Sequence, residues 1–409
     1  MSEWSGRDFE FVIIGGGAVG CGVAYSLAAA GHRDVLLLER AGDLGEATTS
    51  QGAGLCGQIR DSAERTRLAM RAVQIFRELQ AHAAVKPDWN EVGSLRLALS
   101  DAAVAQFHHL QSVAAACGIQ SALIAREEAE QLWPALNFER VQAVLWCPAD
   151  GFLRPKSLVA SYQSECQAMG LRFAAGTEVH RIQSEAGRAA AVITSGGTVR
   201  CRYVINAAGA NAYHVARLAG LELPIIPVRH EYFVSAEITG LEPRFPCFRI
   251  PDLGLYGRVE ERGLLLGGWE PAALHADPRD YCAAQSPPDI EPDWKVLNAF
   301  EKEMTQLFSG SVGIEKTRVG KGWPTFTPDG RFIIGESSRL PGFVMAGGCN
   351  AHGISGSGGI GKLLVESLFD ENPSDYVRSL SPDRFTETPW NWNDAARQAR
   401  QVYETYYCV

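Results

Sequence analysis

Short apolar segments alternate with glycine-rich turns at the start of the chain. Residues 9–14 are apolar and rich in β-branched side chains, which is typical of a strand buried on both faces. Residues 18–30 are mostly small and apolar and are followed by Gly31, a pattern that predicts a buried helix and its end. Residues 35–38 predict a second buried strand. This order of strand, helix and strand predicts a parallel βαβ unit.

The turn between the first predicted strand and helix carries the pattern GxGxxG at Gly15, Gly17 and Gly20. The first glycine permits a sharp turn, the second lets backbone N–H groups approach a pyrophosphate, and the third lets helix and strand pack closely. Glu39 follows the second strand, where a carboxylate can accept hydrogen bonds from ribose hydroxyls. A glycine turn without a ligand is the alternative. The complete order of elements favours a dinucleotide site, and the acid favours NAD or FAD over NADP.

Residues 40–57 help to separate NAD from FAD. This stretch is polar and glycine-rich, whereas an NAD-type domain usually proceeds to another buried strand and crossover helix. Further strand patterns occur far along the chain, at residues 176–182 and at residues 199–206, which lead into Ala207, Ala208 and Gly209. We therefore expect a dinucleotide domain assembled from separated segments. An NAD-dependent Rossmann enzyme is the disfavoured alternative.

A second glycine-rich stretch lies near the other end of the chain. Residues 343–362 read as a buried strand, a glycine-rich loop and the start of an amphipathic helix. The N-terminus of such a helix has unpaired N–H groups and a partial positive charge. Directed at the pyrimidine ring of a flavin, it would stabilise the negative charge that develops there on reduction. A structural loop packed on the first unit is the alternative, but the two glycine stretches together favour a flavin.

Composition and charge narrow the class of protein. The 409 residues suffice for two or three domains, and 46% hydrophobic with 21% charged residues is an ordinary folded composition. A net charge of −9 disfavours nucleic acid as a partner. The 10 cysteines form no CxxC pair or zinc-type cluster, so we expect reduced thiols, no metal and a cytoplasmic protein. Residues 11–31 lack charge, but their glycine turn disfavours a membrane span, and no secretory leader is expected.

Several segments resemble the D-amino-acid-oxidase-type flavoproteins, most closely the flavin half of dimethylglycine and sarcosine dehydrogenases or oxidases. The segments that carry the resemblance are GGGAVGCGVAYSLAAAG (15–31), NAAGANA (206–212), VRHEYFVS (228–235), GLLLGGWEP (263–271), TPDGRFIIGE (327–336) and CNAHG (349–353). The segment ARQARQVYETYY (396–407) resembles the passage from the flavin half to the folate-binding half of those longer enzymes. On this resemblance, no folate domain is expected in this chain.

The resemblance implies an α/β fold (α+β overall), in which a doubly wound domain of Rossmann type binds FAD. It also implies a second, substrate-binding domain whose mostly antiparallel sheet covers the flavin. Alternating or short strand patterns at 228–234, 254–259 and 263–268 suit that sheet. The predicted division is 1–88, 150–226 and 315–385 for the FAD-binding domain, 89–149 and 227–314 for the substrate domain, and 386–409 for a C-terminal tail.

Substrates in the family are amino acids, commonly N-methylated or otherwise secondary or tertiary amines. The resemblance implies hydride transfer from a carbon next to nitrogen to flavin N5, followed by hydrolysis of the imine. Oxygen, a quinone or an electron-transfer protein would reoxidise the flavin. Two alternatives stay open. One is a hydroxy-acid dehydrogenase on the same scaffold, with His230 as the base; the other is a non-catalytic accessory flavin subunit of a hetero-oligomer.

Three residues are candidates for substrate chemistry. His230 and Tyr256 match positions that resemble the active-site His and Tyr of the dimethylglycine-type enzymes, and Arg60 lies near the place of a carboxylate-binding Arg in related oxidases. The alternatives are a hydrogen-bonded sheet histidine, a tyrosine that caps a core and a surface arginine. Four tryptophans could line the pocket or the core: Trp89, Trp146, Trp269 and Trp323.

Three positions depart from the family. Related dehydrogenases carry a His bonded covalently to FAD where this chain has Gln51, and monomeric sarcosine oxidases carry a tethering Cys where it has Gly322. We therefore expect non-covalent FAD, with Cys349 and Cys56 as conceivable replacement tethers. Ser355 stands where monomeric sarcosine oxidases place a lysine for carboxylate binding and oxygen activation, which weakens an assignment as an oxidase or as an enzyme acting on sarcosine.

The predicted FAD-binding residues come from the two glycine stretches, the loop after Glu39 and the ends of the later strands. They are Gly15, Gly17, Ala18, Val19, Gly20, Glu39, Arg40, Thr49, Ser50, Gln51, Gly54, Leu55, Val179, Ala207, Ala208, Gly209, Gly348, Asn350, Ala351, His352, Gly353, Ile354 and Ser355.

Overall fold

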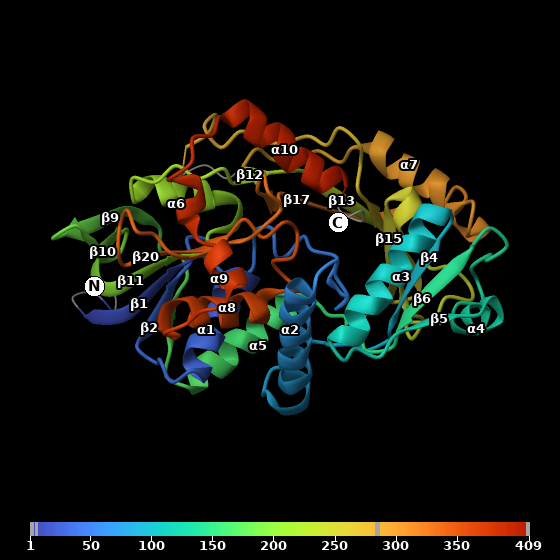
Figure 1. The fold of residues 1–409 in the computed structure, drawn as a ribbon, viewed down its shortest axis with the longest axis horizontal. Coiled ribbons are helices and arrows are strands. Elements are labelled where there is room, and N and C mark those ends of the chain that lie inside the picture. Colours follow the sequence, from blue (N-terminus) through green and yellow to red (C-terminus); the bar gives the residue numbers. More distant parts are fainter. Residues whose placement is uncertain (1–3, 5–6, 283–286, 406–409) are drawn as a thin grey trace.

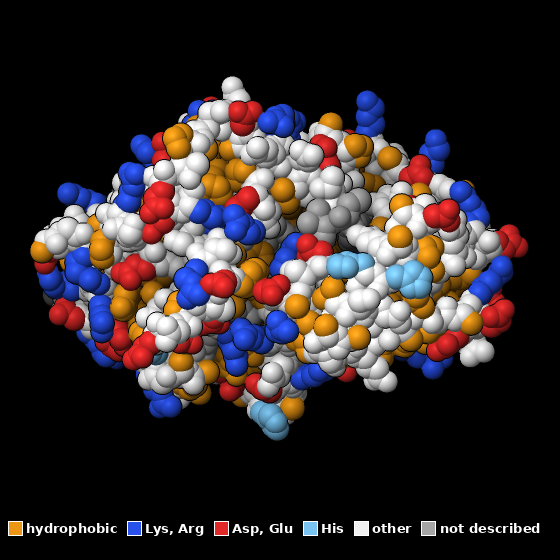
Figure 2. All heavy atoms as spheres, in the orientation of Figure 1, with side chains coloured by type: hydrophobic (Ala, Val, Ile, Leu, Met, Phe, Trp, Pro, Cys, Tyr) orange, Lys and Arg blue, Asp and Glu red, His pale blue; other side chains and the backbone are white. Residues whose placement is uncertain are grey.

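Two large mixed sheets, each with its own covering helices, organise the molecule in the computed structural model (Figure 1). The structure describes residue 4 and residues 7–282 and 287–405. The first sheet lies at the left of Figure 1 and the second at the right, and the red helix α10 (Trp392–Glu404) runs along the top of the view. On the face seen in Figure 2, acidic and basic side chains are interspersed over the surface.

The first sheet assembles strands that lie far apart in the sequence. Its order is β19-β20-β11-β1-β2-β8, and all neighbours from β20 to β8 are parallel. Strand β19 is antiparallel to β20, and β9 and β10 extend the sheet from β11 as an antiparallel pair. The bounds are β1 Asp8–Ile14, β2 Val35–Leu38, β8 Arg172–Ala174, β9 Val179–Glu185, β10 Arg188–Thr194, β11 Gly197–Asn206, β19 Ile333–Glu336 and β20 Phe343–Gly347.

Helices cover both faces of this sheet, which explains why its central strands are apolar throughout. One apolar core joins the sheet to α1 (Ala18–Ala29), α2 (Ala63–His82), α5 (Pro155–Ala168) and α8 (Ser357–Phe369). A separate core on the other face includes α6 (Ala212–Leu218). Helices α1 and α8 approach so closely at Gly22 that a Cβ on this residue would lie 2.7 Å from the carbonyl oxygen of Ser357. The absence of a side chain at Gly22 therefore permits this contact.

The second sheet has the order β17-β13-β16-β15-β14-β4-β6-β5. All of its neighbours are antiparallel except β14 and β4. Its bounds are β4 Ser94–Ala98, β5 Ala122–Ile124, β6 Ala143–Cys147, β13 His230–Ser235, β14 Cys247–Ile250, β15 Leu255–Glu260, β16 Gly263–Gly268 and β17 Lys316–Gly322. Helices α3 (Asp101–Ala116), α4 (Arg126–Leu132) and α7 (Trp294–Met304) pack beside it.

Two small sheets lie near the junction. Strands β3 (Leu55–Cys56) and β7 (Gly151–Phe152) form one, and β12 (Ile226–Pro227) and β18 (Thr325–Phe326) form the other. Helix α10 packs on β12 and β18 through Ala395, Ala399 and Tyr403, which recur every four residues and so share one helix face. The short helix α9 (Asp375–Ser379) follows α8.

The structure confirms the predicted α/β class and the elements that define it. The first βαβ unit forms β1, α1 and β2, and the partners of β1 and β2 on the outer sides, β11 and β8, come from distant segments. The division into domains stays a prediction. One of its boundaries separates a strand from its neighbour, because β17, assigned with 315–385 to the FAD-binding domain, pairs with β13 of the second sheet. Residues 1–3 and 5–6 of the predicted FAD-binding domain, 283–286 of the predicted substrate domain and 406–409 of the predicted tail lie outside the described residues.

Candidate active site

A long cleft runs from the first glycine turn to the face of the second sheet and holds about 1230 Å³ of empty space, part of it open to solvent. Its walls come from the loop after β2, the ends of β11 and β20, and strands of the second sheet. The lining residues are Gly17, Ala18, Val19, Thr48, Thr49, Gln51, Gly52, Ala53, Gly54, Leu55, Arg60, Ala207, Gly209, Ala210, His230, Arg249, Tyr256, Trp269, Gly322, Trp323, Pro324, Thr325, Cys349, Ala351, Gly353, Ile354 and Ser355.

Backbone geometry builds the end of the cleft at the glycine turn. Gly15 has a φ of +114°, and a Cβ there would lie 2.5 Å from the carbonyl oxygen of Ala207, so only glycine fits. A Cβ on Gly20 would overlap the carbonyl oxygen of Gly15. The Glu39 carboxylate accepts hydrogen bonds from the N–H groups of Gly16 at 2.7 Å and Ala41 at 2.8 Å. This carboxylate is therefore fixed beside the turn, as a ribose-binding acid requires.

The loop after β20 is held in an unusual backbone conformation. Asn350 and Ala351 have φ values of +44° and +58°, which non-glycine residues adopt only when their surroundings stabilise them. The Asn350 side chain provides this stabilisation: its Oδ1 accepts from the Thr327 N–H at 3.0 Å, and its Nδ2 donates to the Gly348 carbonyl at 2.9 Å. These hydrogen bonds tie the loop to residues 327–336, one of the segments that carry the resemblance to the flavoprotein family.

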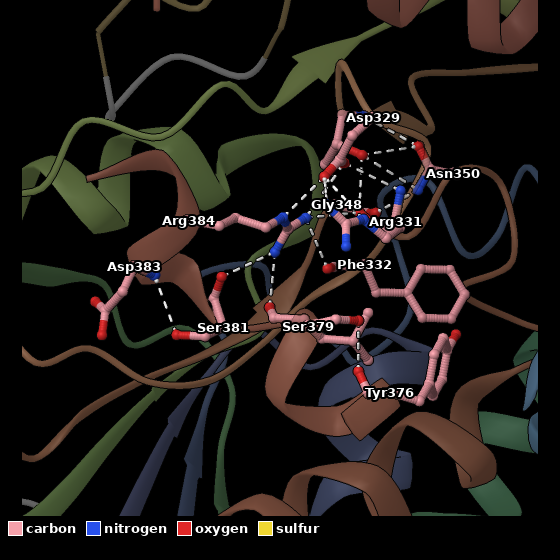
Figure 3. Close-up of polar contacts among 12 residues, drawn as sticks. Asp329, Arg331, Phe332, Gly348, Asn350, Tyr376, Ser379, Ser381, Asp383 and Arg384 are labelled. Atoms are coloured by element: carbon pink, nitrogen blue, oxygen red, sulfur yellow. Dashed lines mark hydrogen bonds and ion pairs between the residues drawn. The ribbon is translucent and has the colours of Figure 1, made fainter. Parts of the chain in front are cut away.

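An ion-pair cluster braces the TPDG turn in that segment (Figure 3). Asp329 lies between Arg331 and Arg384, at 2.9 Å from each guanidinium. Arg384 also donates to the carbonyl oxygens of Leu380 at 2.8 Å and Phe332 at 3.0 Å, which fixes the chain after α9 against the turn. The arginines hold the pKa of the Asp329 carboxyl below its usual value, against the opposing effect of burial. This cluster supports the cleft from behind but does not line it.

Arg60 and His352 contact each other at the inner wall. The Arg60 Nε–H donates to Nε2 of His352 at 3.0 Å, and Nδ1 of His352 is 2.9 Å from the Asn350 carbonyl oxygen. Because Nε2 accepts, Nδ1 must carry the proton and donate it, so His352 is neutral in the Nδ1–H form. Burial and the positive charge of Arg60 both lower the pKa of His352 well below its usual value, in agreement with this tautomer.

His230 lies among aromatic side chains at the face of the second sheet. Its Nε2 is 2.8 Å from the Tyr256 hydroxyl and its Nδ1 is 3.1 Å from the Tyr403 hydroxyl. The imidazole stacks on Trp269 with 4.4 Å between ring centroids. Burial lowers the pKa of His230 to about 3, so this histidine is neutral at ordinary pH. The Tyr256 ring packs against Gly267, because a Cβ on Gly267 would overlap the Tyr256 hydroxyl.

Arg249 contributes a second cation that the sequence did not indicate. It is paired directly with Tyr256 across β14 and β15, so both side chains project from the same face of the sheet. Among the described residues that line the cleft, Arg60 and Arg249 are the charged ones, and the lining contains no Asp or Glu. The cleft therefore presents positive charge and hydrogen-bond donors, which suit an anionic ligand.

The sequence profile of the FAD dependent oxidoreductase (DAO) family matches residues 10–367. The chain belongs to this family. It is 28% identical over 398 residues to 4-methylaminobutanoate oxidase (formaldehyde-forming) of Paenarthrobacter nicotinovorans, covering 97% of this chain and 48% of that protein. It is also 28% identical over 411 residues to the mitochondrial dimethylglycine dehydrogenase of Homo sapiens, covering 98% and 47%. The chain thus spans about half the length of these relatives.

A solved structure confirms the family fold. L-proline dehydrogenase from P. horikoshii superposes with a TM-score of 0.83 at 24% identity, over 93% of this chain and 98% of the other. The family is FAD-dependent, and the cleft fits FAD: Gly17 and Ala18 of the glycine turn line it, where backbone N–H groups suit a pyrophosphate, and the Glu39 carboxylate is fixed beside the turn. At the other end, residues 348–356 and the face of the second sheet enclose a space suited to a flavin ring.

The two positions at which related enzymes carry a covalent link to FAD, Gln51 and Gly322 in this chain, lie close together in the structure. A Cβ on Gly322 would lie 3.2 Å from Cβ of Gln51, and both residues line the cleft. Cys349 also lines it, but burial raises the pKa of its thiol to about 12, which disfavours the thiolate. Cys56 is buried outside the lining, and burial likewise raises the pKa of its thiol. Ser355, the residue at the position of the oxygen-activating lysine in monomeric sarcosine oxidases, lines the cleft beside Ile354.

The predicted residues divide into two groups. Most line the cleft, including His230, Tyr256 and Arg60. Those that do not line it are Gly15, Gly20, Glu39, Arg40, Ser50, Val179, Ala208, Gly348, Asn350 and His352. Of the tryptophans, Trp269 and Trp323 line the cleft, whereas Trp89 packs in the core of the first sheet and Trp146 against that of the second. The roles of individual residues remain proposals.

Sequence reasoning missed Arg249 and Tyr403. An arginine between the apolar residues Phe248 and Ile250 in a four-residue strand was a signal for Arg249, because its side chain points to the opposite face from theirs. The four-residue spacing of Ala395, Ala399 and Tyr403 was a signal for a buried helix face. Among the residues that the structure describes, no helix is long and apolar enough to cross a membrane, and no cluster of three or more His, Cys, Asp or Glu could hold a metal ion.

Proposed function

We propose that this protein oxidises an amino acid or an N-methylated amine that carries a carboxylate, at a carbon next to nitrogen. Bound FAD would supply the two-electron acceptor, taking a hydride from that carbon. The imine that remains would be hydrolysed by water. Arg60, Arg249 and Tyr256 would bind the carboxylate, and the aromatic wall of Trp269 and Trp323 would exclude water from the reacting carbon.

The observation that carries this proposal is the charge of the cleft. Two guanidinium groups and the Tyr256 hydroxyl line its substrate end, and no described acidic side chain lines it. A guanidinium recognises a carboxylate in a fixed orientation through paired hydrogen bonds. A substrate carboxylate in the cleft would lie against these two guanidinium groups. A carboxylated amine is therefore the substrate class that the described lining favours.

The state of His230 favours an amine over a hydroxy acid. Oxidation of a hydroxyl requires a base to take its proton, whereas a neutral amine expels the hydride with its own lone pair. Burial lowers the pKa of His230 to about 3, and both of its nitrogens already contact tyrosine hydroxyls. His230 is accordingly a weak base, and a hydroxy-acid dehydrogenase is the less supported alternative.

Anaerobic reduction of the flavin tests the proposal. The purified FAD-loaded protein is mixed with 4-methylaminobutanoate, sarcosine, dimethylglycine, proline or other amino acids, and the oxidised flavin band is followed. Each amine is paired with its decarboxylated counterpart as the control. We expect bleaching by at least one carboxylated amine and none by its counterpart. Equal bleaching by both members of a pair would contradict the role of the arginines.

Two other outcomes point elsewhere. Bleaching by a 2-hydroxy acid but by no amine would establish the hydroxy-acid alternative. Stable FAD binding without bleaching by any donor would favour an accessory flavin subunit. The acceptor is tested by admitting air to the reduced protein: because Ser355 stands where a lysine activates oxygen in related oxidases, we expect slow reoxidation by oxygen and faster reoxidation by a quinone or an artificial electron acceptor.

A further inference from the structure

A side chain of the C-terminal helix contacts His230, which lines the substrate end of the cleft. Tyr403 is 1% exposed, and its hydroxyl is 3.1 Å from Nδ1 of His230. The ring also packs edge-on against Trp269, with 5.0 Å between centroids, and against Phe326 at 5.4 Å. Tyr403 is thus held in place from three sides, and its hydroxyl has a defined direction toward His230.

The hydrogen bonds around His230 are not equivalent. A neutral imidazole has one N–H donor and one bare nitrogen that accepts. Each nitrogen of His230 contacts a tyrosine hydroxyl, at 3.1 Å for Tyr403 and 2.8 Å for Tyr256. One tyrosine must therefore donate to the imidazole, and the other must accept from it. The tautomer of His230 decides which tyrosine does which.

The surroundings of Tyr403 decide the tautomer. Among the described residues, the Tyr403 hydroxyl contacts no acceptor other than Nδ1 of His230. If Nδ1 carried the proton, it would donate to the Tyr403 oxygen, and the buried Tyr403 hydroxyl would have no acceptor for its own proton among the described residues, which is costly. Nδ1 is therefore the bare nitrogen, and Nε2 carries the proton.

Tyr256 then receives a hydrogen bond instead of giving one to His230. With Nε2–H donating to its oxygen, Tyr256 directs its own proton away from His230, and Tyr256 lines the cleft next to its strand partner Arg249. We propose that Tyr403 is a positioning residue: it holds His230 in the Nε2–H tautomer and so makes Tyr256 a hydrogen-bond donor to the substrate carboxylate. This inference rests on the proposed function.

Carboxylate binding to the FAD-loaded protein tests the proposal without turnover. Acetate is titrated while the flavin absorption is recorded, and its Kd is compared for the wild type, Tyr256→Phe, Tyr403→Phe and the double variant. We expect each single variant to raise Kd about tenfold or more, as for loss of a hydrogen bond to a charged group. Because Tyr403 acts through Tyr256, the double variant should bind acetate no more weakly than Tyr256→Phe.

A remote variant controls for the loss of a hydroxyl. Tyr203 is buried in β11, where its ring stacks on Phe11 at 5.2 Å, so Tyr203→Phe should leave the acetate Kd unchanged. Additive losses in the double variant would show that Tyr403 only supports the structure and would overturn the inference. So would an unchanged Kd in Tyr403→Phe.

The tautomer can be observed directly in the unmodified protein. The chain has 9 histidines, so selective ¹⁵N labelling gives few signals, and His230→Gln identifies those of His230. We expect a protonated Nε2 and a bare Nδ1; the reverse pattern would overturn the assignment to Tyr403. A wild type with the expected tautomer that does not bind acetate would instead overturn the carboxylate role, and with it the proposed function. The two failures are thereby distinguishable.

Discussion

The two ends of the cleft are built in different ways. At the proposed nucleotide end, the glycines and backbone of residues 15–20 form the turn, and the Glu39 carboxylate accepts a hydrogen bond from the Gly16 N–H at 2.7 Å. At the proposed substrate end, side chains from β13, β14 and β15 line the cleft, and Tyr403 of α10 contacts one of them, His230. The first end depends on the close approach of main chains. The second depends on strand register and on a helix more than a hundred residues away.

A side chain at the glycine turn should have the largest effect and should act on one end alone. Gly20→Val places atoms against the Gly15 carbonyl oxygen and should abolish FAD binding, measured by flavin absorption after reconstitution. Gly42→Ala is the matched control, because a Cβ there meets nothing within 4 Å. Normal FAD content in Gly20→Val would show that the turn does not have to stay this tight.

Loss of a cation at the substrate end should leave FAD binding unchanged and weaken substrate binding. Arg249→Met removes a guanidinium that lines the cleft, and we expect KM for the carboxylated amine, or the acetate Kd, to rise about tenfold or more. Arg244→Met, at a guanidinium whose side chain is 81% exposed, is the control and should change neither quantity. A loss of FAD in Arg249→Met would mean that the two ends are not separable.

Removal of FAD measures how the nucleotide end holds its ligand. Gln51 and Gly322 stand at the tether positions, so acid precipitation should leave the flavin in the supernatant. At a free FAD concentration of 100 times Kd, binding should add about 2.7 kcal/mol to the free energy of unfolding, so the apoprotein should melt several degrees lower. Yellow colour retained in the pellet would point to a covalent bond, with Cys349 as the cleft-lining candidate.

The smallest effect concerns the histidines. Burial holds the folded-state pKa of His230 at about 3 and that of His352 well below the ordinary 6.5. As pH falls below about 6.5 the unfolded chain gains protons on these residues that the folded protein does not, so the free energy of unfolding falls between pH 6.5 and 3. The Tm should therefore drop less from pH 7.5 to 5 in His230→Gln than in the wild type. His180→Gln, which changes an exposed histidine, is the control, and its Tm should drop as much as that of the wild type.

The same contrast explains what the sequence could predict. The residues of the proposed nucleotide end lie close together in the sequence, so the spacing of Gly15, Gly17, Gly20 and Glu39 was enough to predict a turn between two strands. Strands β1 and β2 lie where the apolar patterns predicted them. Arg249 could not be placed in this way, because its proximity to Tyr256 depends on the register of β14 against β15. The resemblance to a family supplied His230, Tyr256 and Arg60, which local patterns alone would not distinguish from ordinary sheet and surface residues.

Tyr403 was harder still to predict. Its contact with His230 requires both the docking of α10 on β12 and β18 and the path of the chain before it. That path is fixed in part by Arg384, whose guanidinium contacts Asp329 at 2.9 Å (Figure 3). Neither contact follows from a period or a motif, since a surface arginine and an amphipathic helix occur in many folds.

The position of β11 in the first sheet has a consequence for synthesis of the protein. This strand pairs with β1 on one side and with β20 on the other, and α1 rests against α8. While the chain grows from the ribosome, the N-terminal βαβ unit therefore waits for more than three hundred further residues before its sheet and helix layer are complete. Such long-range pairing makes folding slow. Cofactor loading would come late, after α8 has emerged, and an interrupted chain would expose the apolar face of α1.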